Sequence, residues 1–125
     1  MEALTYYKIK KMSPLFLVAD INTSLKFYVN ELNFEVDFLY EDFYAGIIKD
    51  GHSIHLKVSD YSSEERKEKR NDANINITFS VSNIEDLYEA LSHKSIEIVQ
   101  QLRDMPYGKE FYIADPDGNI IAFLE

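Results

Sequence analysis

The sequence of 125 residues predicts an α+β fold made of two tandem βαβββ modules. Three observations lead to this prediction: short stretches of alternating apolar and polar residues, two amphipathic helical stretches, and the same order of elements in both halves. Residues 60–72 separate the halves, and nine of these thirteen residues are charged. We therefore expect one domain over residues 1–125, with modules at about 13–59 and 73–125 and a solvated linker at 60–72.

Composition excludes several classes of function. The net charge of −9, from 22 acidic and 13 basic residues, repels phosphate backbones and argues against a nucleic-acid partner. No apolar run approaches the roughly 20 residues of a membrane span, and the N-terminus lacks the apolar core of a signal peptide. The absence of cysteine excludes disulfides and thiolate metal sites. These features predict a cytoplasmic protein with no membrane partner.

The first module begins with a buried strand over Pro14–Ala19. The polar residues that follow predict a helix with Asn22 or Thr23 as its N-cap. Asn33 is expected to end this helix in the left-handed conformation. Apolar residues at helical spacing form its buried stripe: Leu25, Tyr28, Val29 and Leu32.

Three strands complete the first module. Residues 34–40 alternate, which predicts a common face for Phe34, Val36, Phe38 and Tyr40. A second strand over 43–49 and a third over 52–58 are joined by Asp50-Gly51, a two-residue hairpin signal. Residues 1–12, which carry three lysines among apolar side chains, form either an extra strand or an arm that packs on a partner.

The second module repeats this order. Residues 74–81 alternate clearly, and Asn83 is positioned to cap a second helix. A strand near Ile96 and Ile98 follows, and residues 107–125 form a closing hairpin around a turn at 115–119. The expected stripe of the second helix is Ile84, Leu87, Tyr88 and Leu91.

Three motifs carry a resemblance over essentially the whole chain: Val18-Ala19-Asp20-Ile21, Ser24-Leu25-Lys26-Phe27-Tyr28 and Asp115-Pro116-Asp117-Gly118-Asn119. They resemble the vicinal oxygen chelate superfamily, which holds glyoxalase I, extradiol dioxygenases and bleomycin-resistance proteins. The resemblance implies a cupped mixed sheet with helices outside. In the superfamily's enzymes the cup holds one divalent metal, and the implied ligand positions are Ser13, His55, Asn76 and Ala122.

Of these four positions only His55 offers a good metal ligand. We therefore expect no metal, no cofactor and no catalytic residue, and a binding protein is favoured over an enzyme. The enzyme alternative stays open: a lyase, isomerase or dioxygenase-type activity on a small oxygenated metabolite. A metal-free version of it would have His55 and Glu110 share acid–base work.

A closer resemblance to the bleomycin-resistance proteins runs through residues 32–38, 41–50 and 107–111. It implies a homodimer that exchanges an N-terminal strand and forms ligand grooves lined by aromatic and acidic residues. The predicted function is therefore metal-free binding of a small molecule, with sequestration of a cationic aromatic antibiotic of the bleomycin type, and hence antibiotic resistance, as its specific form.

The strand alternation divides side chains between core and cavity. Residues expected to pack under the helices are Phe16, Val18, Ile54, Leu56, Ile77, Phe79, Ile121 and Phe123. Residues expected to face the cavity are Leu15, Leu17, Ser53, His55, Lys57, Asn74, Asn76, Thr78, Ile120, Ala122 and Leu124. The candidate ligand-binding residues are Phe38, Phe43, His55, Asn76, Thr78 and Tyr107.

Each candidate has a simpler interpretation as well. His55 could be a general base, a lone metal ligand or a hydrogen-bonded pocket residue. The aromatic candidates could stack on a flat or cationic ligand, or could pack in the core. Nearby carboxylates at Asp37, Glu41 and Asp42 could attract a cation, or could be a solvated turn.

Overall fold

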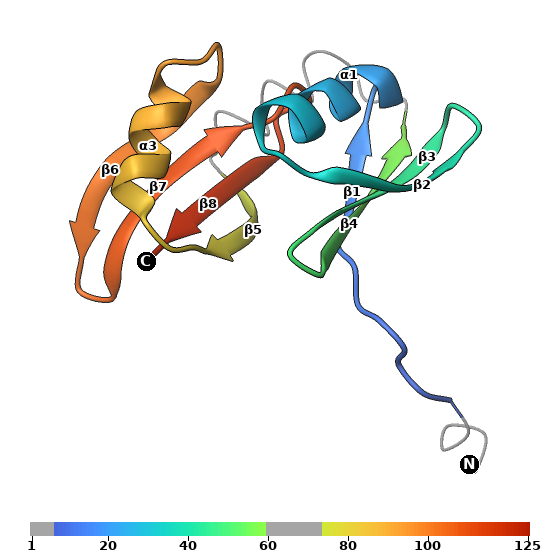
Figure 1. Ribbon diagram of the computed structural model, residues 1–125, viewed down its shortest axis with the longest axis horizontal. Coiled ribbons are helices and arrows are strands. Elements are labelled where there is room, and N and C mark those ends of the chain that lie inside the picture. Colours follow the sequence, from blue (N-terminus) through green and yellow to red (C-terminus); the bar gives the residue numbers. More distant parts are fainter. Residues whose placement is uncertain (1–6, 60–73) are drawn as a thin grey trace.

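Each module forms its own four-stranded mixed sheet, and the two sheets lie side by side (Figure 1). The computed structural model describes residues 7–59 and 74–125; the predicted linker at 60–72 lies outside the described residues. The first module contains β1 (Leu15–Val18), α1 (Ile21–Leu25), η2 (Lys26–Glu31), β2 (Glu35–Tyr40), β3 (Tyr44–Lys49) and β4 (His52–Val58). The second contains β5 (Ile75–Ser80), α3 (Ile84–Ser92), β6 (Glu97–Met105), β7 (Gly108–Ala114) and β8 (Ile120–Leu124).

The two sheets have the same topology. Sheet A has the order β1-β4-β3-β2 and sheet B the order β5-β8-β7-β6. In each sheet the first strand pairs in parallel with the last strand of its module, and the other neighbours are antiparallel. The predicted α+β fold of two tandem βαβββ modules is confirmed. Within the described residues no helix is long and apolar enough to span a membrane.

The first helix begins two to three residues earlier than predicted. Asp20 is the N-cap: its Oδ2 accepts hydrogen bonds from the Thr23 backbone N (2.8 Å) and from Thr23 Oγ1 (2.9 Å). The prediction of Asn22 or Thr23 is wrong because both already lie inside α1. The helix then widens into the π-helical segment η2. Asn33 follows with φ of 63°, which confirms the predicted left-handed end.

The second helix is capped from a distance. Asn83 occupies the N-cap position of α3, as predicted, but its φ is 57° and its side chain makes no capping hydrogen bond. This left-handed backbone is not the extended one that an N-cap residue usually has. Instead the Glu125 carboxylate accepts hydrogen bonds from the N of Asn83 (3.2 Å) and of Ile84 (2.8 Å). Glu125 is held by two backbone hydrogen bonds to Lys109.

One apolar core lies under the helices. Of the eight residues predicted to pack there, six are buried, and Ile77 and Phe79 pack against the core half-buried. Three residues expected to face the cavity, Ser53, Ile120 and Ala122, are instead buried, at 7%, 0% and 4% exposed.

The common face predicted for the residues of β2 is also wrong. A β-bulge between Val36 and Phe38 pairs Val36 with the buried Ile47 and Phe38 with Gly46. Cross-strand partners point to the same face of a sheet, so the bulge moves Phe38 to the face opposite Val36.

The closing turn, residues 115–119, joins the second module to the first. Asp115 accepts four hydrogen bonds: from Tyr28 Oη (2.7 Å), the Asp117 N, and the N and Nδ2 of Asn119. Asp117 Oδ1 accepts from the Ala19 N (2.9 Å), and Asn119 Nδ2 donates to the Leu17 carbonyl (3.3 Å). Burial raises the pKa of Asp115, and the donated hydrogen bonds oppose that rise. The motif that marks the family in sequence is thus a joint between modules.

Candidate binding site

The open face of sheet A carries an aromatic wall, formed by Phe38, Tyr44 and His55. The rings of Phe38 and Tyr44 stack with centroids 6.0 Å apart, and the Phe38 ring meets His55 edge-on at 5.2 Å. Register places Gly46 between them, paired with Phe38 on one side and His55 on the other. A Cβ at Gly46 would overlap the Phe38 ring, so the glycine is what lets this ring lie flat on the sheet.

His55 is a hydrogen-bonded member of this wall. Its Nδ1 lies 3.0 Å from Tyr44 Oη, and the side chain is half-buried. A general base is usually oriented by a carboxylate or another charged partner. The partner of His55 is a neutral phenol, which favours the interpretation of His55 as a pocket residue.

The other predicted site residues lie elsewhere. Phe43 packs on Tyr40 with ring centroids 5.5 Å apart, beside the wall. Asn76 braces a bulge: its Oδ1 accepts from the Ile120 N at 2.8 Å. Thr78 is exposed on β5, and Tyr107 is exposed at the start of the β6–β7 turn. The structure therefore brings Phe38 and His55 together and leaves Phe43, Asn76, Thr78 and Tyr107 outside the wall.

The four positions that the family resemblance implies for a metal do not fit one. Ser13 Oγ is hydrogen-bonded to Ser53 Oγ, and Asn76 Oδ1 is occupied by the Ile120 N. Ala122 has no donor atom, which leaves His55 alone. Among residues 7–59 and 74–125 no group of three His, Cys, Asp or Glu is placed to hold a metal ion. Divalent metal sites need about three protein ligands.

The open face of sheet B carries a different arrangement, the Glu110 network of Arg103, Tyr107, Glu110 and Tyr112. Glu110 Oε2 accepts from Arg103 Nε (2.8 Å), Arg103 Nη2 (2.6 Å) and Tyr112 Oη (3.0 Å), and Oε1 accepts from Tyr107 Oη (2.6 Å). Burial alone would raise the pKa of Glu110, but the hydrogen bonds from Tyr107, Arg103 and Tyr112 together lower it. Glu110 is therefore an ionised acceptor that donors of its own sheet occupy.

Sequence reasoning missed this network. The sequence suggested Glu110 only as an acid–base partner of His55, and no motif in it linked Glu110 with Arg103. Part of the signal was available in the sequence. Glu110 and Tyr112 are two residues apart and therefore share a face of one strand, and Arg103 lies a few residues before them, within reach of a neighbouring strand. Arg103 pairs with Glu110 in the register set by the two-residue turn at 106–107, and the register shifts of β6–β7 begin only beyond Arg103. Sequence patterns do not identify this turn, so they do not predict the pairing.

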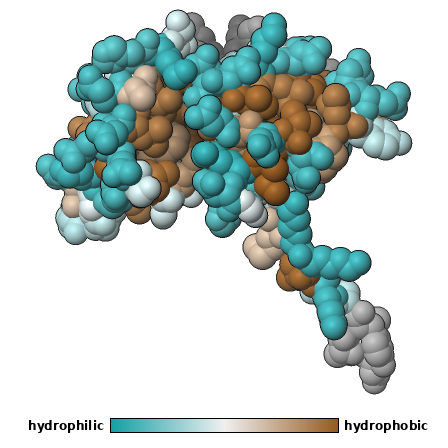
Figure 2. Space-filling model, in the orientation of Figure 1, coloured by the Kyte–Doolittle hydropathy of each residue, from teal (hydrophilic) through white to brown (hydrophobic). Residues whose placement is uncertain are grey.

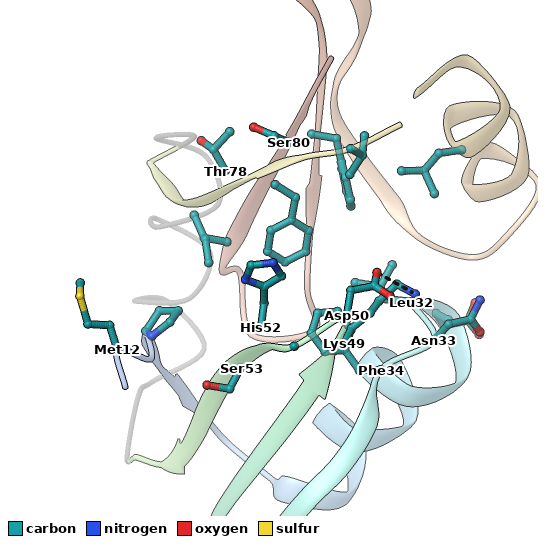
Figure 3. A pocket seen from close by; sticks show the side chains of 18 of the residues that line it. Met12, Leu32, Asn33, Phe34, Lys49, Asp50, His52, Ser53, Thr78 and Ser80 are labelled. Atoms are coloured by element: carbon teal, nitrogen blue, oxygen red, sulfur yellow. Dashed lines mark ion pairs between the residues drawn. The ribbon is translucent and has the colours of Figure 1, made fainter. Parts of the chain in front are cut away.

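A cavity of about 670 Å³ lies between the two modules. Figure 3 shows His52, from the start of β4, pointing toward β5, whereas Thr78 and Ser80 project from the other side of that strand. Apolar residues of both modules form much of its lining, including Leu32, Phe34, Ile77, Phe79 and Leu87. Of the predicted site residues, Thr78 alone lines this cavity.

Comparison with known proteins agrees with this architecture. Residues 12–123 match the model of the Glyoxalase/Bleomycin resistance protein/Dioxygenase superfamily. A bleomycin-binding protein from Streptomyces verticillus, solved with copper(II)-bleomycin, is similar at 21% identity and a TM-score of 0.68, covering 94% of this chain and 97% of that one. TnmS3, an antibiotic binding protein from Streptomyces sp. CB03234, is similar at 16% identity and a TM-score of 0.64, covering 94% and 98%.

A third solved structure, a superfamily member from Sphaerobacter thermophilus, is similar at 22% identity with a TM-score of 0.72, and the match covers 94% of this chain and 98% of that one. These likenesses concern the fold. No curated protein matches the sequence.

Proposed function

The chain belongs to the Glyoxalase/Bleomycin resistance protein/Dioxygenase superfamily, as its sequence predicts, and from that premise we propose that it binds a small aromatic molecule without a metal. The ligand stacks on the aromatic wall of Phe38, Tyr44 and His55. Sequestration of the ligand, without chemical change, is the proposed activity. The proposal places the protein in the cytoplasm, where a chain without cysteine is unaffected by reducing conditions.

The observation that carries the proposal is the exposed, prearranged Phe38 ring. This side chain is 38% exposed although it packs on Gly46, Tyr44 and His55, so one of its faces is available to a ligand. An aromatic pair is worth about 0.5–1.5 kcal/mol beyond the burial of its area. A ring already held by its neighbours loses little conformational entropy on binding.

The charge of the proposed ligand follows from the surroundings of the wall. The protein carries a net charge of −9, and exposed carboxylates at Glu41 and Asp42 lie in the turn after β2. Asp37 is already paired with Lys11 at 3.6 Å, so it contributes less. An aromatic cation would gain from this field and from contact with the ring faces. The bleomycin-binding and antibiotic binding proteins of the same fold support a role in binding a small molecule.

We also propose a homodimer. Strand β2 is a sheet edge, and all six of its residues are exposed. Beside the aromatic wall, further exposed apolar side chains gather at this edge, in the half of the molecule that also shows hydrophobic surface in Figure 2: Val36, Leu39, Tyr40 and Phe43. Residues 7–12 extend away from the sheets and expose Tyr7, Ile9 and Met12 (Figure 1). An unprotected apolar edge and an apolar arm are features that a second copy would cover.

Thermal denaturation with two probes, copper(II)-bleomycin and 2-naphthylmethylammonium, tests the binding proposal. A probe at 100 times its dissociation constant should stabilise the protein by about 2.7 kcal/mol. Phe38→Ala should remove most of this shift, whereas Ile75→Ala, which truncates an exposed apolar side chain on the other sheet, should leave it intact. Phe43→Ala asks whether the binding surface extends to the adjoining turn. No shift with either probe, or a shift that survives Phe38→Ala, would overturn the proposal.

A further inference from the structure

The outer edge of the Arg103 guanidinium is exposed, and the proposed function does not use it. We propose that Arg103, held in place by Glu110, binds the carboxylate of an aromatic acid at the open face of sheet B. This second site lies on a different sheet from the aromatic wall and takes a ligand of the opposite charge.

The geometry separates two edges of the guanidinium. The inner edge, formed by Nε and Nη2, donates to Glu110 Oε2 at 2.8 and 2.6 Å. Nη2 also donates a long hydrogen bond to Tyr112 Oη, at 3.4 Å. The Nη1 group has no hydrogen-bond partner among the described residues, and the Arg103 side chain is 41% exposed against 6% for Glu110. The outer edge, which carries Nη1, therefore presents hydrogen-bond donors to solvent, while the buried Glu110 carboxylate holds the inner edge.

The network fixes the direction of those donors. Glu110 also accepts hydrogen bonds from the hydroxyls of Tyr107 and Tyr112. These bonds hold the carboxylate in one orientation, and the carboxylate in turn holds the guanidinium. The Arg103 Cζ lies 5.8 Å from the centre of the Tyr112 ring. One oxygen of the ligand carboxylate accepts from Nη1, and the other accepts from Nη2 in place of the long bond to Tyr112. A guanidinium whose orientation is set in advance loses less entropy when it binds.

A neighbouring ion pair shows that linking β6 to β7 by a salt bridge does not require a buried carboxylate. Lys109 and Asp104 are also partners across β6–β7, and their Nζ–Oδ1 distance is 2.7 Å. Both of these side chains are exposed, 41% and 82%, and each binds one partner. Burying the Glu110 carboxylate and surrounding it with four donated hydrogen bonds costs dehydration that an exposed brace avoids. We infer that the buried Glu110 carboxylate serves to orient the Arg103 guanidinium.

The ligand class follows from charge and shape. Because Glu110 offsets the charge of Arg103, recognition depends on directional hydrogen bonds at contact more than on long-range attraction. Tyr107, which is 59% exposed and shares the Glu110 carboxylate with Arg103, offers an apolar ring surface beside the guanidinium. A flat aromatic ring with a carboxylate satisfies both features, whereas an ammonium group in the same place would meet donors only.

Three matched probes test the proposal by calorimetric titration: naphthalene-2-carboxylate, naphthalene-2-carboxamide and 2-naphthylmethylammonium. We expect the carboxylate to bind Arg103 about tenfold more tightly than the carboxamide. Arg103→Lys keeps the charge but removes the planar fork, and should weaken carboxylate binding about tenfold. Lys109→Arg, at the neighbouring pair, should change it by less than about twofold.

A measurement on the unchanged protein covers the case in which Arg103→Lys fails to fold. The ¹⁵N resonance of Arg103 Nε, assigned through its loss in the lysine variant or by triple-resonance experiments, should shift with the carboxylate and stay with the carboxamide. Phe38→Ala should leave this response unchanged, which separates the site from the aromatic wall. No carboxylate binding at millimolar concentration, an equal response to the three probes, or an unmoved Arg103 resonance would overturn the proposal.

Discussion

Two hairpin turns occupy equivalent places in the two modules and have opposite environments. The turn between β7 and β8, residues 115–119, is buried and bonded to Ala19, Tyr28 and Leu17 of the first module. The turn between β3 and β4 is Asp50-Gly51. The Asp50 side chain is 81% exposed and lies 3.7 Å from Lys49, the last residue of β3. The same hairpin position thus joins the modules in one case and borders the cavity between them in the other.

The open faces of the two sheets also differ, in the type of residue at equivalent positions. In sheet A the cross-strand pair Gly46–His55 puts the small residue on the middle strand, and Phe38 covers it. In sheet B the equivalent pair is Tyr112–Ala122, with the large residue on the middle strand and the small one beside it. A neighbouring position carries Tyr44 in one sheet and Glu110 in the other. Exchanges at a few register positions therefore give one fold an aromatic face and a charged one.

The largest effect is expected at the buried turn. Asp115→Ala removes the acceptor of four hydrogen bonds and leaves buried donors of Tyr28, Asp117 and Asn119 without that acceptor. We expect a loss of about 3 kcal/mol or more in the free energy of unfolding, measured with urea.

Asp50→Asn is the matched control: asparagine tolerates the left-handed backbone of this residue (φ of 52°), so removing the exposed charge should stay within about 0.5 kcal/mol of the original protein. Equal losses in the two variants would contradict the contrast between the turns. Tyr28→Phe, which removes one donor of the buried turn, should fall between them.

A smaller effect is expected at the aromatic face. Gly46→Ala places a methyl group where the Phe38 ring lies, so the ring must leave the sheet, at a cost of about 1–3 kcal/mol. The same variant should lose binding of 2-naphthylmethylammonium. In a Phe38→Ala background Gly46→Ala should cost much less, because the overlapping ring is gone. Additive losses in this double-mutant cycle would contradict the proposed contact.

The charged face should differ from the aromatic one in its dependence on pH. The pKa of Glu110 is lower in the folded protein than its usual value, so its contribution to stability is present above the unfolded-state pKa. That contribution is lost as the pH falls through the folded-state pKa. Arg103→Leu should therefore flatten the acid limb of a plot of unfolding free energy against pH. Asp104→Asn, in the exposed neighbouring pair, should leave the limb nearly unchanged; an equal change would argue against a special role for Glu110.

Much of the fold could be predicted because its signals are local. The alternation of residues 75–80 and the spacing of Ile84 and Leu91 identify a strand and a helix without knowledge of the rest of the chain. The aromatic face could be predicted only in part, since the bulge at Val36 and Phe38 changes which residues share a face. The Glu110 network depends on cross-strand register, and a one-residue shift would separate Arg103 from Glu110.

The smallest effect is expected where the two helices begin, the third place at which the modules differ. Helix α1 is capped by Asp20, three residues before its bonded partner, whereas α3 is capped by Glu125 from the far end of the chain. Glu125→Ala should remove both hydrogen bonds to the start of α3 and cost about 1 kcal/mol in the free energy of unfolding.

Because the backbone of Glu125 pairs with Lys109, this substitution leaves the end of sheet B in place and isolates the contribution of the carboxylate. Glu125→Gln retains an oxygen acceptor without the charge, so its loss should be smaller, and the difference between the two variants should shrink as salt is added. Glu35→Ala, which removes an exposed carboxylate from β2, is the control and should change stability little. If Glu125→Ala leaves the unfolding free energy unchanged, then α3 begins without help from the carboxylate, and the two helix starts do not differ in the way that the structure indicates.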